Sequence, residues 1–436
     1  MAWAAIPIEH WTQASGVQVY LVPSQAIPML DVQIDFDAGS RRDPPDKAGL
    51  ASVTASMTGK GVRAGKAPGA GAQAAEPALD ENALSEAWAD LGASFGAGAS
   101  SDRMSFSLRS LTYPDLLAKA AQLAARQLGE PAFPETIWQR ERQTLSAALK
   151  EANTRPATLA ARAFNTAVYG QHPYGFEMTQ ESLDRISVAD MNTVYGSLIQ
   201  PCRAKVTIVG AVNRAQADGL VTQLFSRLPA TTPATCPALP AVPEVAPLDK
   251  ASEQHIAFDS AQAHVLIGQP GYKRDDPDYF ALTVGNYILG GGGFVSRLTN
   301  EVREKRGLTY SIYSYFAPAL HAGAFTLGLQ TRPDQATQAV QVSRDVVADF
   351  VAKGPTEAEL KAAKDNLIGG FALRIDSNRK LLDNVANIAW NKLALDYLDT
   401  WTQQVEKVTA ADIKAAFARK LQPQKMVTVV LGAEGK

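Results

Sequence analysis

Histidine and cysteine, two side chains that often bind transition metals, are scarce in this sequence. There are five histidines and two cysteines among 436 residues. A catalytic zinc site usually takes two of its ligands from histidines spaced so that both rings reach one ion. No two histidines are four residues apart, and the closest pair, His255 and His264, is separated by nine positions. The sequence therefore predicts no local zinc motif, and we expect no cofactor in this chain.

Long apolar runs and an excess of one charge are also lacking. Every apolar run ends well before the roughly 18 residues that a membrane-spanning helix requires, and 42 basic residues balance 44 acidic ones. We therefore expect no membrane span and no nucleic-acid partner. A dinucleotide-binding glycine motif is missing too, because Val295 stands where Gly-x-Gly-x-x-Gly needs its last glycine.

A proline-rich stretch divides the chain into two similar halves. Residues 229–247 contain six prolines, which exclude a helix or a central strand and favour an extended linker. We predict an N-terminal lobe at residues 5–228, a linker at 229–250 and a C-terminal lobe at 251–436. Segments in one lobe match segments in the other at an offset of 222 residues, and this indicates an internal duplication. The matching pairs are 186–190 with 408–412, and 204–210 with 425–432.

Within each half, strands precede most of the helices. Alternating apolar and polar residues predict strands, with one solvated face, at 17–22, 29–36 and 103–108. Helical spacing follows from Tyr113 to about Tyr169. In the second half, strands are predicted at 264–268 and 309–316, and helices from about residues 281, 335, 356 and 410. This grouping indicates two α+β lobes with antiparallel or mixed sheets.

One segment resembles a known zinc motif with its ligands replaced. Residues 49–57 read Gly-Leu-Ala-Ser-Val-Thr-Ala-Ser-Met, whereas pitrilysin-type inverzincin peptidases carry Gly-Leu-Ala-His-x-x-Glu-His. Ser52 and Ser56 stand at the two histidine positions, and Ala55 stands at the general base. The resemblance covers nearly the whole chain. It implies a fold of two homologous α/β-sandwich lobes that face each other as a clamshell.

The third zinc ligand of that family is replaced as well. In active members it is a glutamate, seven residues after another glutamate that orients the site. Glu141 matches the earlier position, and Ala148 stands at the ligand position. Since serine and alanine do not substitute for zinc ligands, the pattern indicates a subunit without metal chemistry of its own. We interpret Glu141 as a charge on a helix surface.

The second half retains a different family signature. Arg303 and Tyr310, in the segment 288–311, resemble an arginine and tyrosine pair that reaches the zinc site in active members. A guanidinium and a phenol can both donate hydrogen bonds to the oxyanion formed during peptide hydrolysis. We expect Arg303 to lie near the end of a helix on which Phe294, Leu298 and Val302 form a buried stripe. We expect Tyr310 to lie on the next strand. Taken singly, the two side chains could equally be an exposed charge and a packed aromatic.

Four successive glycines precede this signature. Structurally, Gly290, Gly291, Gly292 and Gly293 would form the flexible start of a helix. They also resemble the glycine-rich segment that the non-catalytic subunit of the mitochondrial processing peptidase presents to substrate, and this implies peptide binding.

These features lead to one main hypothesis. The resemblance to bacterial heterodimeric peptidases implies a metal-free subunit, inactive alone, whose homologous partner binds zinc and cleaves peptides. The alternative is a non-catalytic scaffold or peptide-binding protein of the same fold. A serine hydrolase based on Ser52 or Ser56 is disfavoured, because no base lies near either residue in the sequence.

The sequence gives two weak indications of cellular location. Ala2-Trp3-Ala4-Ala5 has the small-x-small form of a signal-peptidase site, and bacterial members of the resembled family are often periplasmic. Cys202 and Cys236 would suit that compartment if bridged, but the sequence leaves their pairing open. We expect a periplasmic protein, with the cytoplasm as the alternative.

Overall fold

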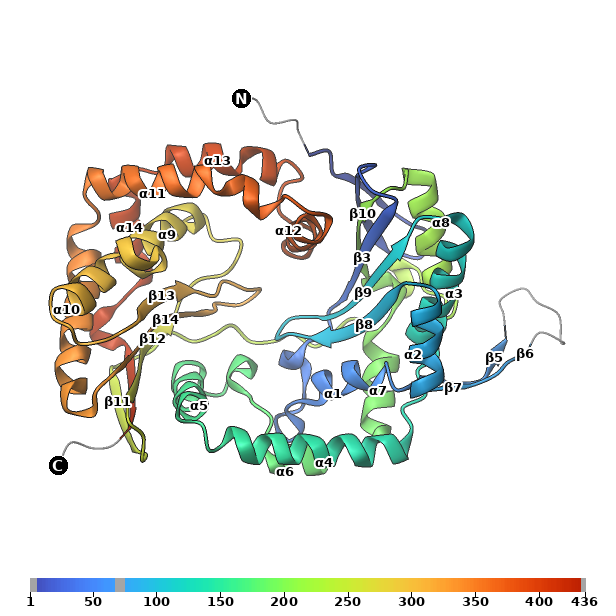
Figure 1. Ribbon diagram of the computed structural model, residues 1–436, viewed down its shortest axis with the longest axis horizontal. Helices are drawn as coiled ribbons and strands as arrows, with labels where there is room; N and C mark the ends of the chain where they lie inside the picture. Colours follow the sequence, from blue (N-terminus) through green and yellow to red (C-terminus); the bar gives the residue numbers. More distant parts are fainter. Residues whose placement is uncertain (1–5, 67–74, 433–436) are drawn as a thin grey trace. The chain divides into compact units, whose positions relative to one another are not determined.

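The computed structural model describes residues 6–66 and 75–432 and confirms the α+β class (Figure 1). The residues at the predicted signal-peptidase site lie outside these ranges. The chain folds into two compact units, each built around one mixed sheet. Unit 1 is formed from Met1–Ala147, Met178–Val242 and Ala372–Asp399, and unit 2 from Ala148–Glu177, Pro243–Phe371 and Thr400–Lys436.

Unit 1 contains a six-stranded sheet in the order β1-β2-β10-β3-β9-β8. Strand β10 runs parallel to β2, and the other neighbours are antiparallel. The strands are β1 (Glu9–Thr12), β2 (Gln18–Pro23), β3 (Met29–Phe36), β8 (Ser94–Ala99), β9 (Met104–Leu111) and β10 (Lys205–Gly210). Four two-residue strands form two further small ladders: β4 (Gly61–Val62) with β7 (Leu79–Asp80), and β5 (Gly65–Lys66) with β6 (Ala75–Glu76).

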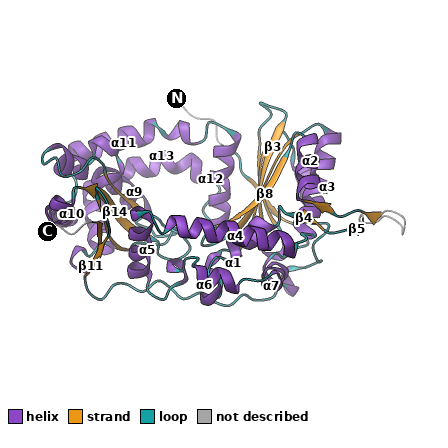
Figure 2. Ribbon diagram, turned by 60° about the horizontal axis from the view of Figure 1, so that its bottom comes forward, coloured by secondary structure: helices purple, strands orange, loops and turns teal. Residues whose placement is uncertain are grey.

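Helices cover both faces of this sheet. Helices α2, α3 and α8 lie on one face, and α12 lies on the other (Figures 1 and 2). Their bounds are α2 (Glu81–Asp90), α3 (Pro114–Gly129), α8 (Arg214–Leu224) and α12 (Asn378–Asn391). The unit also contains α1 (Leu50–Met57), α6 (Gln180–Arg185), α7 (Val188–Leu198) and most of α4 (Glu135–Ala152).

The predicted solvated face of strand β3 is wrong, because helix α12 covers it. Asp31, Gln33 and Asp35 alternate along β3 as expected, yet each is buried. Their polar groups find partners within the sheet: Arg109 contacts Asp31 at 2.7 Å, and Arg103 contacts Asp35 at 3.0 Å. Buried carboxylates paired in this way keep the polar pattern of an exposed strand. The alternation therefore reports the side-chain chemistry of this face but not its burial.

Unit 2 contains a five-stranded sheet in the order β11-β15-β12-β14-β13. Strand β15 runs parallel to β11, and the remaining neighbours are antiparallel. The strands are β11 (Ser252–Ala257), β12 (Ala263–Pro270), β13 (Ile312–Phe316), β14 (Ala324–Thr331) and β15 (Val427–Gly432). Helix α5 (Pro156–Tyr169) packs on one face of the sheet through Phe164 and Val168. The other helices are α9 (Tyr279–Asn286), α10 (Ala336–Lys353), α11 (Glu357–Gly369), α13 (Tyr397–Lys407) and α14 (Ala410–Lys420).

The two units repeat each other in detail, which confirms the internal duplication. In each sheet the last strand of the repeat runs parallel to one neighbour and antiparallel to the other. The helix before that strand begins with a capping box in both copies. Ser187 and Asp190 bond reciprocally at the start of α7, and Thr409 and Asp412 do so at the start of α14, 222 positions later.

Each unit also takes one helix from the opposite half of the sequence. Helix α5 belongs to the predicted N-terminal lobe but packs against β12 and β15 in unit 2. Helix α12 belongs to the predicted C-terminal lobe but packs against β3 and β10 in unit 1. The predicted lobes, each a continuous stretch of sequence, do not include this exchange of helices. Both helices are amphipathic, so each has one apolar face available to cover a sheet.

The proline-rich segment forms no strand, and its single regular element is a 3₁₀ turn at Pro233–Thr235. A disulfide joins Cys236 in this segment to Cys202, with the Cα atoms 5.9 Å apart. Both cysteines lie in unit 1. No helix among residues 6–66 and 75–432 is both long and apolar enough to cross a membrane.

Candidate functional site

Helix α1 holds the degenerate zinc motif and begins at a buried carboxylate. The two Asp43 carboxylate oxygens accept hydrogen bonds from the backbone N–H groups of Gly49 and Ala51, both at 2.9 Å. These groups would otherwise be unpaired at the N-terminus of the helix. Burial raises the pKa of Asp43 to about 7, although the same N–H groups act to lower it.

The motif positions on α1 have the orientation that ligands would need but not the chemistry. Ser52 and Ser56 are exposed and lie four residues apart, so they share one face of the helix, whereas Ala55 is buried. Two hydroxyls and a methyl group do not fit zinc, which takes imidazole, thiolate or carboxylate ligands. In the part of the chain that the structure describes, no group of three or more His, Cys, Asp or Glu side chains could hold a metal ion.

Glu141 is engaged by cations within unit 1. Its carboxylate lies 2.8 Å from Arg140 and 3.2 Å from Lys60. The hydrogen bond from Arg140 is the largest cause of its lowered pKa. Lys60 and Arg140 also both contact Glu81, at 2.6 Å each. These ion pairs fit the interpretation of Glu141 as a surface charge. Ala148, seven residues further along α4, is exposed and offers no ligand atom.

Arg303 and Tyr310 meet in unit 2 with a third side chain. The guanidinium carbon of Arg303 lies 5.1 Å from the centre of the Tyr310 ring and 4.9 Å from that of Phe294. Such cation–π contacts hold a guanidinium in place. Tyr310 is 82% exposed and Phe294 is 75% exposed, so the cluster presents its donors to the surroundings. We call these three residues the Arg303 cluster.

The backbone around the cluster departs from a regular helix. Residues Thr299–Glu304 form a π-helical turn, and Gly307 ends it with a positive φ of 62°. The Gly307 N–H donates to the Arg303 carbonyl at 2.8 Å, and the Leu308 N–H donates to the Val302 carbonyl at 3.0 Å. These bonds close the end of the helix. Short π-helical segments often occur at functional sites.

Two predictions about this region are wrong. Phe294 does not belong to the buried stripe, although Leu298 and Val302 do. The reason is that Phe294 lies in a separate 3₁₀ turn, Gly293–Val295, so its spacing of four from Leu298 does not place it on the same helix face. Tyr310 precedes the strand, which begins at Ile312. Sequence reasoning therefore missed Phe294 as a neighbour of Arg303, and no local pattern indicated it.

Two of the four glycines are required by packing. A Cβ atom added to Gly290 would lie 2.4 Å from the Ser314 hydroxyl, and one added to Gly292 would lie 2.6 Å from the Tyr287 carbonyl. A Cβ atom added to Gly291 would lie 2.8 Å from the side-chain amide nitrogen of Asn286, which can move. Gly293 has open space but a positive φ of 62°. The run thus has a structural explanation, and its part in peptide binding stays a prediction.

The duplicated α+β fold, together with a zinc-motif helix that lacks ligand side chains, defines a non-catalytic relative of two-unit zinc peptidases. A family model described as peptidase M16 inactive domain matches residues 185–367. A crystal structure of a peptidase M16 inactive domain from Pseudomonas fluorescens is 33% identical, with a TM-score of 0.89, over 98% of both chains. The chain therefore belongs to the M16 peptidase family, as a member of its inactive type.

Curated relatives are more distant. An uncharacterized zinc protease of Mycobacterium leprae is 28% identical over 273 residues, which are 62% of this chain and 60% of that protein. The chain thus spans less than two thirds of that relative's length. A non-peptidase homolog, YmxG of Helicobacter pylori, is 24% identical over 91% of this chain and 87% of its own length.

Proposed function

We propose that this chain is the metal-free subunit of a heterodimeric zinc peptidase that acts on peptides. Its partner would be a homologous M16 chain that retains the His-x-x-Glu-His motif and binds the zinc ion. The Arg303 cluster carries the proposal, because it holds a guanidinium and an exposed phenol side by side on a chain whose own motif does not fit zinc. In the complex, Arg303 and Tyr310 would complete the partner's active site.

The chemistry of the two side chains suits this role. Attack of water on a peptide carbonyl creates a negative oxygen, and fixed hydrogen-bond donors at that oxygen lower the barrier. Tyr310 can donate one directed hydrogen bond, and Arg303 can donate two parallel ones to substrate carbonyls. Since Arg303 already packs between two rings, little side-chain freedom would be lost when substrate binds. Gly290, Gly291, Gly292 and Gly293 would contact the peptide beside them.

The test uses the full chain together with its partner. Co-purification should yield an M16 chain with an intact zinc motif, and metal analysis should find zinc in that chain. Tyr310→Phe should lower the kcat of the complex on the order of 100-fold, the usual cost of one oxyanion donor. Tyr113→Phe removes the same hydroxyl group from an exposed tyrosine of unit 1, outside the proposed site, and should leave kcat unchanged.

Two results would contradict the proposal. Unchanged peptidase activity with Tyr310→Phe would exclude a role for this phenol in catalysis. Recovery of the chain with no zinc-motif partner would favour the alternative, a scaffold or peptide-binding protein of the same fold. A scaffold has no use for an exposed pair of hydrogen-bond donors, and this is why the heterodimer is preferred.

We also propose a periplasmic location. The disulfide between Cys202 and Cys236 supports it, because such bonds persist in oxidising compartments and are rare in the cytosol.

A further inference from the structure

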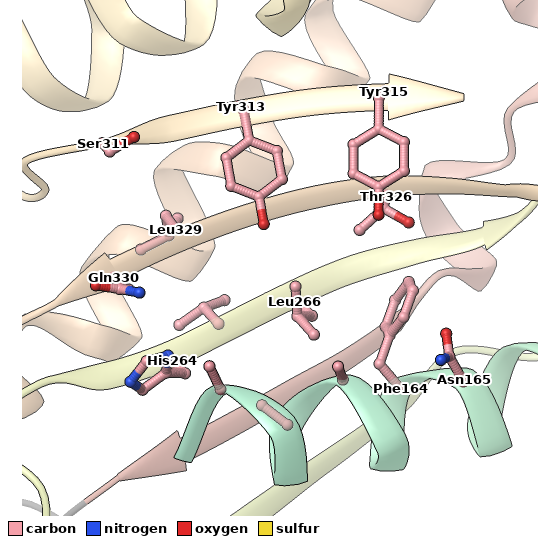
Figure 3. A pocket seen from close by; sticks show the side chains of 14 residues that line it. Phe164, Asn165, His264, Leu266, Ser311, Tyr313, Tyr315, Thr326, Leu329 and Gln330 are labelled. Carbon is pink, nitrogen blue, oxygen red and sulfur yellow. The ribbon is translucent and has the colours of Figure 1, made fainter. Parts of the chain in front are cut away.

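A groove crosses the sheet of unit 2. It lies between helix α5 and the edge strand β13, and its floor is formed by β12 and β14 (Figure 3). Its volume is about 320 Å³, which is at the small end of the range for ligand sites. All of its lining residues belong to unit 2. Nothing in the proposed function accounts for it.

Two tyrosines form one wall of this groove. Tyr313 and Tyr315 are two residues apart on β13, and their rings stack with centroids 6.0 Å apart. Their hydroxyl groups point across the groove toward β14 (Figure 3). Gly328, opposite Tyr313 in β14, makes this possible, since a Cβ atom there would lie 2.5 Å from the Tyr313 hydroxyl. The wall therefore carries two phenols that can donate and accept hydrogen bonds.

The opposite wall is apolar and built from small side chains. Ala157, Ala160 and Ala161 on α5 line it together with Phe164. Alanine leaves open the space that a larger residue would fill. Leu266 on β12 continues the apolar surface across the floor.

Polar side chains close both ends of the groove. His264 and Gln330 face each other in the β12–β14 register at one end, and Asn165 lies at the other (Figure 3). Burial lowers the pKa of His264, so its ring is neutral at pH 7. No Asp, Glu, Lys or Arg is among the residues that line the groove. An ionised ligand would therefore lose water without gaining a counter-charge.

We propose that this groove binds an uncharged, extended peptide stretch of three or four residues, with an aliphatic or aromatic side chain over Leu266. The length follows from β14, because the lining residues Thr326 and Gln330 are four residues apart and therefore about 13 Å apart at strand rise. Phenol, amide and imidazole groups can pair with the N–H and C=O groups that a bound backbone would bring. An aliphatic or aromatic side chain of the bound peptide would pack against the apolar wall and floor.

The groove also bears on substrate choice, although this consequence rests on the proposed function. Tyr310 lies two residues before β13, and the tyrosines of the groove follow on the same segment. A substrate contacting Tyr310 could therefore continue along β13 into the groove. It would then be selected for neutral residues a few positions from the cleaved bond.

Binding is tested with the full chain and a blocked peptide, acetyl-Ala-Leu-Phe-Leu-Ala-amide, by calorimetry. Ala161→Trp should fill the groove from α5 and weaken binding at least tenfold. Thr166→Trp places the same ring on the exposed side of the same helix and should leave the affinity unchanged. Matching thermal unfolding of both variants would show that the loss does not come from misfolding.

Replacing the central Phe of the probe by Lys or by Glu should each weaken binding at least tenfold. The proposal is overturned if the neutral peptide does not bind at millimolar concentration, if charged probes bind equally well, or if Ala161→Trp has no effect. Binding of maltotriose in place of the peptide would reassign the groove to a carbohydrate.

Measuring peptide binding with the isolated chain separates this proposal from the heterodimer, because every residue that lines the groove belongs to this chain. Binding that survives while the partner experiment fails would refute the heterodimer alone. The reverse result would refute the groove alone.

Discussion

Single side chains decide what helix α1 can hold. Ser52 and Ser56 share its exposed face, four positions apart, and this is the spacing at which two imidazoles could meet one ion. The backbone geometry of the motif is thus retained while its ligands are gone. Lys60 and Arg140 form ion pairs with the carboxylate of Glu141.

The carboxyl group of Asp43 makes stability depend on pH. Its pKa is about 7 in the folded chain, well above its ordinary value, so the folded state keeps a proton that the unfolded chain releases between about pH 4 and pH 7. This contribution to the free energy of unfolding is present below that window and is lost as the pH rises through it. Asp43→Asn keeps one of the two acceptor oxygens and does not titrate.

Urea unfolding of both proteins from pH 4.5 to pH 8 measures the effect. The free energy of unfolding of wild type relative to Asp43→Asn should fall across this range. Curves that stay parallel would show that the carboxyl group titrates at its ordinary pKa.

At the scale of elements, the local signals in the sequence were sufficient for many helix and strand positions. The helix predicted from about residue 410 begins there with Thr409 as its cap, and such a cap acts through groups only three residues away. The strand at Met29–Phe36 was predicted with its bounds. The cover of that strand could not be predicted, since an amphipathic helix shows that it buries a face but not against which sheet.

At the candidate site, too, the sequence predicted only part of the arrangement, as the Arg303 cluster shows. The pairing of Arg303 with Tyr310 followed from a resemblance, and the structure brings the two together. Phe294 joins them through a 3₁₀ turn and a π-helical turn, which shift the helical phase between residues 294 and 303. A periodicity of 3.6 residues does not anticipate such shifts.

Helix α5 should depend on its apolar face for its place on the unit 2 sheet. Phe164 is buried in a cluster with Val168, Val427 and Val429. Phe164→Ala should lower the free energy of unfolding by about 3 to 5 kcal/mol and speed amide exchange along α5. Thr166→Ala, on the exposed side of the helix, should change stability by less than about 0.5 kcal/mol.

Denaturant titration and hydrogen exchange followed by mass spectrometry measure both effects. If Phe164→Ala left the exchange of α5 unchanged, another contact would hold the helix on the sheet.

At the scale of the whole molecule, the disulfide ties the start of the proline-rich segment to unit 1. It closes a loop between residues 34 positions apart. By its effect on the entropy of the unfolded chain, such a cross-link contributes roughly 3 to 4 kcal/mol. Reduction should therefore lower the Tm of the wild-type protein. The double variant Cys202→Ala, Cys236→Ala should start at the lower Tm and not respond to the reductant.

Differential scanning calorimetry with and without dithiothreitol makes the comparison. If the reductant did not change the Tm of the wild-type protein, Cys202 and Cys236 would not form a disulfide in solution.

The exchange of α5 and α12 makes the two halves of the polypeptide dependent on each other. A gene cut at the proline-rich segment would give an N-terminal fragment that carries α5 without its sheet and leaves β3 and β10 uncovered. The C-terminal fragment would have the mirror-image defect, with α12 unplaced and Phe164 missing from the apolar surface of β15. Helices α5 and α12 lie 222 positions apart, the offset of the duplication, so the two halves of the chain exchange the same helix of the repeat.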